Sequence, residues 1–416
     1  MARSLQFLRL FRMLLDDRVT ADLQVIQNMG LLAVKIAQMY AVRTDLLPPE
    51  KCQALSQLFD NATPIPFEKF DSAVNRDAPE PLAQHLDNIQ PKPLATASLG
   101  QVHRATLDDG TQVVIKILRE DHRPEFEKDL RTVRRLAKSA LFFYPKLERV
   151  ADPIGVLDAV ERTTLTEMTL TREISGTQVL KDLRDQHIED LPHLKQLHFP
   201  VFHPDLSNDR VLVSTFIPAP TVRRLLAAQQ FPYEALLTLF RIHGYYLFYH
   251  GKFHGDLHPG NIHYDPESKT FWLLDNANVE SVPPTFARGL LEMLAALGTA
   301  DFPRAADTLL ALSTTTPRNP TTFKEAFLNL YQNFSNRPVA EISLTRQMAK
   351  TIRLAVDHGL TFPKGAFPVV KSLMYLDGMA LQCNPDARLL QDVLSFQSDI
   401  QKLLGTSNHE VSPALS

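Results

Sequence analysis

The sequence predicts an α+β protein in which a helical N-terminal extension precedes a β-rich segment and a long helical C-terminal half. Helical periodicity dominates residues 1–60, two β-rich runs follow within 93–118, and helical patterns fill 284–405. A chain of 416 residues that is 44% hydrophobic and 22% charged has ordinary globular composition and room for about two to three domains. We therefore expect a folded protein of two lobes with an added helical segment.

The charge and the cysteine content exclude several classes of protein. The 44 Lys and Arg residues against 47 Asp and Glu residues give a net charge of −3, so nothing predicts attraction to nucleic acid. Cys52 and Cys383 lie far apart without a CxxC or Cys/His spacing, which argues against zinc and against a disulfide framework. No apolar run reaches the roughly 18 residues of a spanning helix. We expect a cytoplasmic protein without a transmembrane helix.

The first residues, MARSLQFLRLFRMLLDDR, predict an amphipathic helix. Leu5, Leu8, Phe11 and Leu15 share one helical face, and arginines lie elsewhere on the helix. Three interpretations stay open, namely a first helix docked on the rest of the protein, peripheral contact with a membrane surface, and a targeting peptide. No small-residue cleavage site follows the segment, and we favour the docked helix.

The following elements can be placed from local patterns. The LPPE at 47–50 begins a helix with proline in its first turn. The β-rich runs within 93–118 flank DDG, which is a hairpin signal, and the second run ends on Lys116. Residues 125–143 and 158–187 return to helical patterns. The run RVLVSTFIPAP is then a buried strand that two prolines end.

The second half of the chain begins with a buried helix over 233–250, directly before the loop FHGDLHPGNI at 253–262. The run TFWLLD predicts a short strand that has Asp275 at its end. Helices follow over 284–405, and the last residues, 406–416, are expected to fray.

The loop FHGDLHPGNI carries a spacing that suits phosphoryl transfer. An Asp can orient the attacking hydroxyl while an Asn five positions later binds Mg²⁺, and Asp256 and Asn261 have this spacing. In chain order, the strand residue Lys116 and the helical residue Glu173 precede them, and Asp275 follows. Each residue taken singly has an ordinary structural explanation. Their combined order is that of a kinase, which predicts a nucleotide site.

These residues have distinct expected roles. Lys116 would neutralise the α and β phosphates of ATP, Glu173 would fix Lys116, and Asp256 would orient the acceptor hydroxyl. Asn261 and Asp275 would hold Mg²⁺. The sequence thus predicts ATP and Mg²⁺ as cofactors.

The histidines of the loop have separate interpretations. We expect His254 to pack or hydrogen-bond as a structural residue and His258 to lie near phosphate. As zinc ligands, the two histidines lack a third partner.

The segment before Lys116 is ATASLGQV, where an ordinary kinase has a Gly-rich loop, and only Gly100 is left. With this Ala-rich loop the sequence resembles the UbiB/AarF (ADCK-type) family of atypical kinases. The resemblance implies a two-lobed protein-kinase-like fold with an N-terminal helical extension. It also implies nucleotide contacts from the loop and from the strand that leads to the hinge, at Ala95, Ala97, Ser98, Gly100, Val102, Lys116, Thr215 and Ile217.

The extension is similar to the family's Lys-x-Gly-Gln segment. In LAVKIAQMYAVRTDLLPPEKCQALSQL, Lys35 and Gln38 are in place, and Ala37 stands where the family has Gly. The resemblance implies that this segment folds over the site and blocks the approach of a protein substrate. Lys35 and Gln38 would then be regulatory, with Glu167 as the ion-pair partner of Lys35.

Two further motifs resemble the family but depart from its pattern. In LTEMTLTREISG, Glu167 and Glu173 match a Glu-x-Asp pair followed by the Glu that binds the strand Lys, and Thr169 replaces the Asp. In LLDNANVE, Asp275 matches the metal-binding Asp of Asp-Phe-Gly, and Asn276 and Ala277 replace the other residues. The resemblance extends over residues 25–400 and implies four parts: an extension (1–92), an N-lobe (93–218), a C-lobe (219–405) and a flexible tail (406–416).

The resemblance implies an ATP-binding, Mg²⁺-dependent atypical kinase or ATPase that supports isoprenoid quinone or lipid metabolism. The expected partners are a nucleotide and either a membrane surface or prenyl lipid and quinone-biosynthesis proteins, without nucleic acid. Two alternatives stay open: a small-molecule phosphotransferase, because such kinases share a His-x-Asp loop that ends in Asn, and a nucleotide-responsive pseudokinase scaffold. The phosphate acceptor cannot be read from the sequence.

Overall fold

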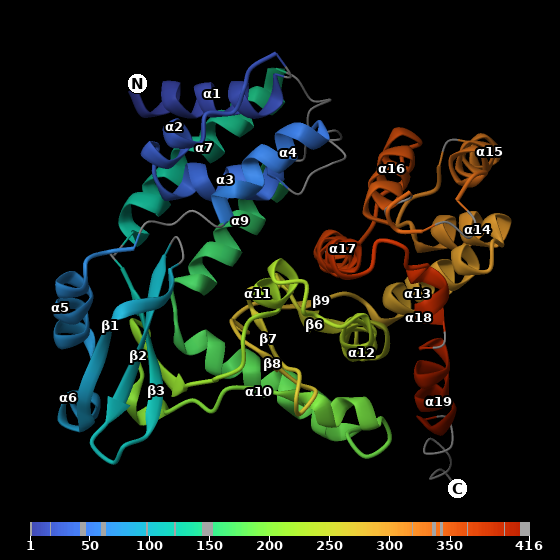
Figure 1. Cartoon of the computed structure of the whole chain (residues 1–416). Coiled ribbons are helices and arrows are strands. Elements are labelled where there is room, and N and C mark those ends of the chain that lie inside the picture. The colour runs from blue at the N-terminus through green and yellow to red at the C-terminus, as the bar shows by residue number, and fades with distance from the viewer. Residues whose placement is uncertain are drawn as a thin grey trace, which may run out of the picture. The chain divides into compact units, whose positions relative to one another are not determined.

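The computed structural model describes most of the chain, which forms two compact units (Figure 1). The described residues are 2–16, 18–41, 47–59, 64–96, 99–119, 122–143, 153–317, 319–334, 338–341, 344–363, 365–394 and 396–407. Unit 1 comprises Met1–Ser175 and Pro200–Ile217, and unit 2 comprises Gly176–Phe199 and Pro218–Ser416.

Helices of the extension pack with α7 and α9 around one hydrophobic core of unit 1 (Figure 1). Their bounds are α1 (Ala2–Leu15), α2 (Leu23–Asn28), α3 (Leu31–Ala41), α4 (Pro49–Ser56), the 3₁₀ turn η1 (Gln57–Phe59), α7 (Arg123–Phe143) and α9 (Pro153–Glu167). Helix α4 begins at Pro49, because proline suits a first turn in which its missing N–H group loses no hydrogen bond. The helical prediction is confirmed for the described part of residues 1–60.

Helix α1 docks mainly through residues outside the predicted apolar stripe, of which only Phe11 packs against the core and the three leucines are exposed. Phe7, Leu10 and Leu14 are buried in the core, whereas Leu5 is 65% exposed and Leu8 is 52% exposed. The spacing of the three buried residues is itself helical, so α1 has two apolar faces and buries one of them. The guanidinium group of Arg3 fixes which face turns inward, because it forms an ion pair with the buried Asp129 of α7.

A four-stranded antiparallel sheet in the order β1-β2-β3-β5 forms the rest of unit 1. Its strands are β1 (Leu86–Thr96), β2 (Gly100–Leu107), β3 (Gln112–Leu118) and β5 (Val211–Thr215). The 3₁₀ turn η3 (Pro204–Leu206) precedes β5. Two helices, α5 (Phe67–Asp77) and α6 (Glu80–His85), lie beside β1 (Figure 1). The predicted hairpin around DDG is confirmed as β2 and β3, and Gly110 takes a φ of +85° in its turn. Strand β1 begins at Leu86, ahead of the expected start at 93, because Ile89 is buried in the core under the sheet.

The division between the units falls within α10 (Thr171–Gln186). The expected N-lobe, 93–218, included residues 176–199, but these belong to unit 2. They contribute Leu180 and Leu194 to the core of unit 2, and the 3₁₀ turn η2 (Pro192–Gln196) and β4 (Leu197–His198) lie in the same segment. Residues 176–199 belong with unit 2 because these leucines are buried in its core, and local sequence patterns do not reveal in which core a leucine is buried.

Short strands and many helices build unit 2 (Figure 1). The strands are β6 (Lys252–His254), β7 (Ile262–Asp265), β8 (Thr270–Leu273) and β9 (Val279–Ser281), with β4-β8-β7 in one sheet and β6-β9 as a pair. The helices are α11 (Val222–Ala227), α12 (Tyr233–Gly244), α13 (Pro284–Gly298), α14 (Phe302–Leu312), α15 (Pro320–Tyr331), α16 (Leu344–Asp357), α17 (Ala366–Cys383), α18 (Leu389–Leu394) and α19 (Gln397–Ser407). The strand TFWLLD and the helices of 284–405 are confirmed. Helix α19 reaches into the expected tail, and residues 408–416 of that tail lie outside the described residues.

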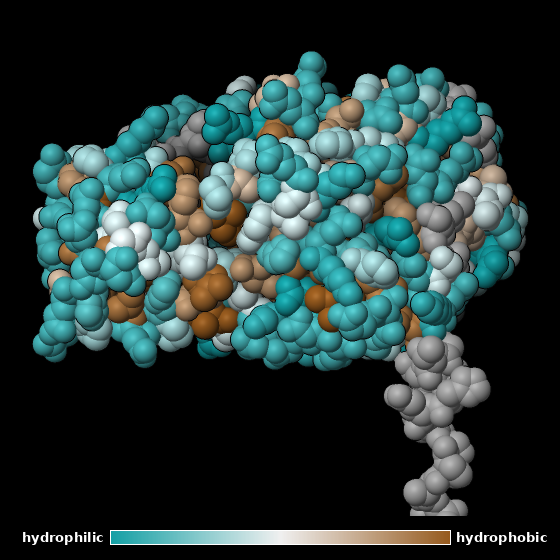
Figure 2. Space-filling model, turned by 60° about the horizontal axis from the view of Figure 1, so that its bottom comes forward, coloured by the Kyte–Doolittle hydropathy of each residue, from teal (hydrophilic) through white to brown (hydrophobic). Residues whose placement is uncertain are grey.

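The surface in Figure 2 is mainly hydrophilic, and its hydrophobic areas are small and separated. Of the helices in the described ranges, none combines the length and the apolar character that crossing a bilayer requires.

The predicted helix over 233–250 divides into α12 and a π-helical turn, η4 (Tyr245–His250), which ends at Gly251. Gly251 has a φ of +65°, and a Cβ atom built there would lie 2.5 Å from the carbonyl oxygen of Val282. Only glycine satisfies both constraints. The chain turns sharply here into β6 and the FHGDLHPGNI loop.

The first prediction concerns the buried His243 of α12. Its Nε2 lies 2.9 Å from Ser372 Oγ of α17, and burial lowers the pKa of His243 to about 3. In the unfolded chain the imidazole of His243 binds a proton below a pH of about 6.5, whereas in the folded chain it stays neutral. The stability that the neutral His243 contributes is therefore fully present above about pH 6.5 and is lost as the pH falls towards 3.

We expect the wild type to lose about 2 kcal/mol of unfolding free energy between pH 7 and pH 5 through this one residue. His243→Gln keeps a polar side chain but does not titrate. Denaturant unfolding of both proteins across this range measures the effect as a difference in slope. Parallel curves for the two proteins would contradict the assignment.

Candidate active site

The predicted pair of Lys116 and Glu173 forms within unit 1. Lys116 Nζ of β3 donates to Glu173 Oε2 of α10 over 2.9 Å, and Glu173 is buried. Asp209 holds the start of this helix, because its carboxylate accepts from the Thr171 hydroxyl and its carbonyl oxygen accepts from the Leu170 N–H at 3.0 Å. No sequence motif marks Asp209, which acts through a contact between distant segments.

Of the residues predicted to contact the nucleotide around the Ala-rich loop, Val102 lies beside Lys116 in the sheet. Ala95 of β1 is the register partner of Val102 in β2, which is also the register partner of Lys116 in β3. A Cβ atom on Gly100 would lie 3.0 Å from the Ile117 carbonyl oxygen, so the two strands approach closely where β2 begins. Two of the predicted residues, Ala97 and Ser98, lie outside the described residues.

The predicted adenine contacts lie at the end of β5. The N–H of Thr215 donates to Val201 O at 2.8 Å, its Oγ1 accepts from the Val201 N–H at 3.1 Å, and the N–H of Phe216 donates to Gln112 O. These two N–H groups are thus already used within unit 1. Ile217 is nearly buried at the end of the segment, and its role stays a prediction.

The predicted ion pair of the extension forms. Lys35 Nζ of α3 donates to Glu167 Oε2 at the end of α9, and the Lys35 side chain is largely buried. Gln38, which the sequence groups with Lys35, lies elsewhere and donates through Nε2 to Leu58 O at 2.9 Å. Ala37 is fully buried in the core of the extension. In this structure Gln38 holds the extension together, and Lys35 is the residue that reaches Glu167.

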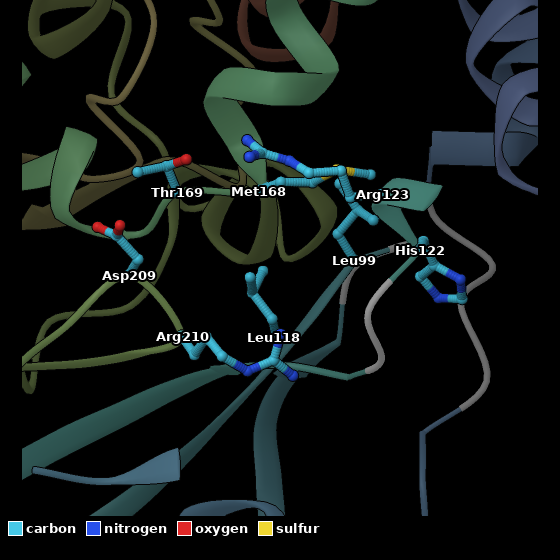
Figure 3. Close-up of a pocket in the computed structure, with 8 residues that line it drawn as sticks. All are labelled: Leu99, Leu118, His122, Arg123, Met168, Thr169, Asp209 and Arg210. Carbon is cyan, nitrogen blue, oxygen red and sulfur yellow. The ribbon is translucent and has the colours of Figure 1, made fainter. Parts of the chain in front are cut away.

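A cavity of about 210 Å³ lies beside the end of β3 (Figure 3). It is lined by Leu99, Leu118, His122, Arg123, Met168, Thr169, Asp209 and Arg210. Its polar groups take part in packing, because Asp209 accepts from Thr171 and Arg210 Nε donates to Asp77 at 2.9 Å. Thr169, which replaces the family's Asp, donates through Oγ1 to Leu165 O at the end of α9. The cavity thus lies in unit 1, where the end of β3 meets the residues just before α10 and just before β5.

In unit 2, His254 supports the FHGDLHPGNI loop as predicted. Its Nδ1 accepts from the Asp256 N–H at 3.0 Å, and its Nε2 lies 3.0 Å from Leu274 O. These partners require one acceptor and one donor nitrogen, which is the neutral ring. Burial lowers the pKa of His254, in agreement with this form. The ring therefore links Asp256 to the residue before Asp275.

The carboxylate of Asp256 lies between an amide and an ammonium group. Asn261 Nδ2 donates to Asp256 O at 3.1 Å and to Asp256 Oδ2 at 3.2 Å. Lys371 Nζ of α17 lies 2.9 Å from Asp256 Oδ1. Desolvation by burial, the largest single influence, raises the pKa of Asp256. The charge and the hydrogen bond of Lys371, together with the nearby histidines, outweigh it, so the pKa lies below its ordinary value. Sequence analysis missed Lys371, which stands in an ordinary amphipathic helix far along the chain.

The two predicted metal ligands are brought together by the β7–β8 hairpin. Ile262 pairs with Leu273, and the Leu274 N–H donates to Asn261 O at 2.9 Å, so Asn261 and Asp275 flank the same end of the hairpin. Asp275 has a φ of +58°, a left-handed conformation that is uncommon outside glycine. Such backbone strain gathers at functional sites.

The donor atoms fit Mg²⁺. Asn261 uses its amide nitrogen on Asp256, so its Oδ1 remains the atom suited to a cation, and Asp275 supplies a carboxylate. Magnesium prefers oxygen ligands and keeps several waters beside one or two protein carboxylates. The described residues contain no group of three or more His, Cys, Asp or Glu side chains that would hold a metal by themselves. The site suits an ion that phosphate and water help to coordinate.

Comparison with known proteins decides the family. Residues 57–309 match the family model of the ABC1 atypical kinase-like domain. The chain belongs to this family. Two relatives, from Sodalis glossinidius and Vibrio parahaemolyticus, both named probable protein kinase UbiB, are each 28% identical to it over 89% of this chain and 68% of their own length. The predicted UbiB/AarF membership is confirmed.

A solved structure shows the same fold. The complex of Rv3197 with erythromycin from Mycobacterium tuberculosis superposes with a TM-score of 0.55 at 18% identity and covers 94% of both chains. The predicted two-lobed, kinase-like α+β fold is confirmed.

In this ABC1-family chain, the asparagine that follows Asp275 in place of Phe has structural partners. Asn276 is fully buried, and its Nδ2 donates to Thr177 Oγ1 at 2.8 Å and to Leu273 O at 2.9 Å. A Cβ atom built on Gly176 would lie 1.8 Å from Asn276 O. Sequence analysis missed Gly176, whose absent side chain lets the segment after Asp275 pack against α10.

We predict that Gly176→Ala destabilises the protein by about 2–3 kcal/mol, because its Cβ atom meets backbone rather than a flexible side chain. Gly378→Ala in α17 is the matched control, since nothing lies within 4 Å of its Cβ position. That change should be neutral or stabilise by up to about 1 kcal/mol. Urea unfolding measures both variants. A Gly176→Ala protein as stable as the control would show that the backbone at Asn276 can move aside without loss of stability.

Proposed function

We propose that this protein is an ATP-binding, Mg²⁺-dependent atypical kinase or ATPase. The observation that carries the proposal is the convergence of Asp256, Asn261 and Asp275 at one end of the β7–β8 hairpin. Phosphoryl transfer requires such an arrangement, in which one carboxylate orients the attacking group and an amide and a second carboxylate lie close to it. The ion pair of Lys116 and Glu173 in unit 1 supports the same function.

The chemical roles follow from the side chains. Lys116 would neutralise the α and β phosphates while Glu173 holds its ammonium group in place. Asp256 would orient the attacking hydroxyl or water and accept its proton. Asn261 Oδ1 and the Asp275 carboxylate would hold Mg²⁺, which supplies charge neutralisation at the phosphates.

The residues that depart from the family pattern do not favour a pseudokinase scaffold. Thr169 and Asn276 make local hydrogen bonds that fasten α9 and the segment after Asp275. They leave Lys116, Glu173 and Asp256 with polar partners. We therefore place the chain among active members, and we propose isoprenoid quinone or lipid metabolism as the setting on the strength of family membership alone.

A membrane surface is the partner that the exposed face of α1 supports. Leu5, Leu8 and Leu15 are exposed on this helix, and Arg9 and Arg12 are exposed beside them. Apolar side chains next to arginines suit insertion at an anionic lipid surface. We propose peripheral contact through this face.

The nucleotide proposal predicts a thermal shift. Wild type with Mg²⁺ and ATP should melt several degrees above the free protein, because a ligand at about 100 times its Kd stabilises by roughly 2.7 kcal/mol. Asp275→Asn should remove most of the shift, and Asp357→Asn, at an exposed position in α16, is the control. A wild type without any shift would overturn the proposal.

Thermal shifts at a series of ATP concentrations test the regulatory role of Lys35. Lys35→Ala should change the ATP affinity or permit autophosphorylation, because it frees Glu167 of its ion-pair partner. Unchanged behaviour in both assays would contradict that role.

The membrane proposal predicts that wild type co-sediments with vesicles that contain anionic lipid. The double variant Leu5→Gln/Leu8→Gln should partition at least tenfold less, since full burial of one leucine side chain contributes about 1.5–3 kcal/mol. Leu381→Gln, which changes an exposed leucine of α17, is the control. Equal binding by all three proteins would contradict contact through α1.

A further inference from the structure

We propose that Lys371, from the C-terminal helix α17, is a positioning residue that holds Asp256 for phosphoryl transfer. This inference rests on the proposed function. It gives the C-terminal helices of unit 2 a part in the chemistry, although the motifs that mark the site all lie before them in the chain.

The carboxylate of Asp256 is held on both of its oxygens. Lys371 Nζ lies 2.9 Å from Oδ1, and Asn261 Nδ2 donates to Oδ2 at 3.2 Å. A carboxylate with one bound oxygen can turn about its terminal torsion, which has a broad energy minimum, whereas a hydrogen bond at one oxygen and an ion pair at the other restrict that rotation. Each carboxylate oxygen accepts more than one hydrogen bond, so an acceptor hydroxyl can still approach. Lys371 therefore sets the direction from which Asp256 meets that hydroxyl.

Lys371 is itself held in place. Its side chain is 23% exposed, and its Nζ lies 5.5 Å from the centre of the Tyr375 ring, one turn along α17. The next residue, Ser372, is buried and hydrogen-bonds to His243 of α12. An ammonium group on a packed helix is preorganised in a way that a surface lysine is not.

Helix α17 touches the loop at a second point. The Tyr375 ring lies edge-on to the ring of His258, with their centres 5.6 Å apart, and His258 Nδ1 accepts from the Gly260 N–H at 3.1 Å. Lys371 and Tyr375 together therefore contact the loop at Asp256 and at His258. These contacts lie within unit 2.

The charge of Lys371 suits the reaction as well as the geometry. Phosphoryl transfer brings phosphate oxygens towards a site that already carries the carboxylates of Asp256 and Asp275. The fixed ammonium group offsets the charge of the Asp256 carboxylate, so this carboxylate keeps its orientation without reorganisation as the phosphates approach. A purely structural ion pair would instead fasten α17 to the loop and leave the rate of the chemical step unchanged.

The experiment compares steady-state ATP turnover by the full chain in Mg²⁺. Lys371→Met removes the charge and keeps the length, Lys371→Arg keeps the charge, and Lys350→Met changes an exposed lysine of α16 as the control. We expect Lys371→Met to lower kcat at least tenfold with KM within about twofold of wild type, which is the signature of an interaction made in the transition state. Lys371→Arg should recover part of kcat, and the control should not differ from wild type.

A double variant separates positioning from an independent effect. Asp256→Asn/Lys371→Met should have the kcat of Asp256→Asn alone, because Lys371 acts through Asp256. Should Lys371→Met fold poorly, as shown by its melting temperature, Lys371→Gln serves in its place with the same expectation.

Two results would overturn the inference while leaving the proposed function intact: wild-type kcat in the folded Met or Gln variant, or losses of kcat in the double variant that multiply. A wild type that neither binds nor cleaves ATP would instead remove the proposed function, and this inference with it.

Discussion

The hydrogen bond from the Leu274 N–H to the Asn261 carbonyl oxygen is the constraint on which the candidate site depends. It closes the open end of the β7–β8 hairpin. Asn261 O, near the end of the loop that contains Asp256, and the nitrogen of Leu274, the residue before Asp275, are 2.9 Å apart. His254 adds a second link, since its ring bridges the Asp256 N–H and Leu274 O. Without these two links, the loop and the segment around Asp275 would be separate surface features. With them, groups of low individual specificity form one oxygen-rich site.

Close packing of backbone carries part of this construction. Gly176 lets α10 approach the Asn276 carbonyl, and Asn276 returns two hydrogen bonds from its buried amide. The segment that these contacts hold includes Asp275, whose left-handed backbone is costly unless the surroundings determine it. The buried Asn276 amide thus anchors the segment that carries the Asp275 carboxylate.

The sequence predicts those parts of the fold and the site that local patterns determine. The hairpin that ends on Lys116 follows from β-branched runs around a turn, and the Asp256–Asn261 spacing follows from the loop itself. Lys371 and Gly176 depend on contacts between segments far apart in the chain, and no periodicity reports them. The buried face of α1 was equally hidden, because the helix has two apolar faces and the partner Asp129 decides between them.

Ion pairing in the free protein also shapes how a nucleotide would bind. Glu173, Glu167 and Asp256 each have a lysine partner in the structure. An ammonium group has several N–H donors, so Lys116 could keep Glu173 and still donate to a phosphate. Removing one partner of such a pair would leave a buried charge alone, which is costly. The pairs therefore keep the acidic groups in fixed positions before a ligand arrives, and under the proposed function a bound Mg²⁺ would offset the charge of the phosphates.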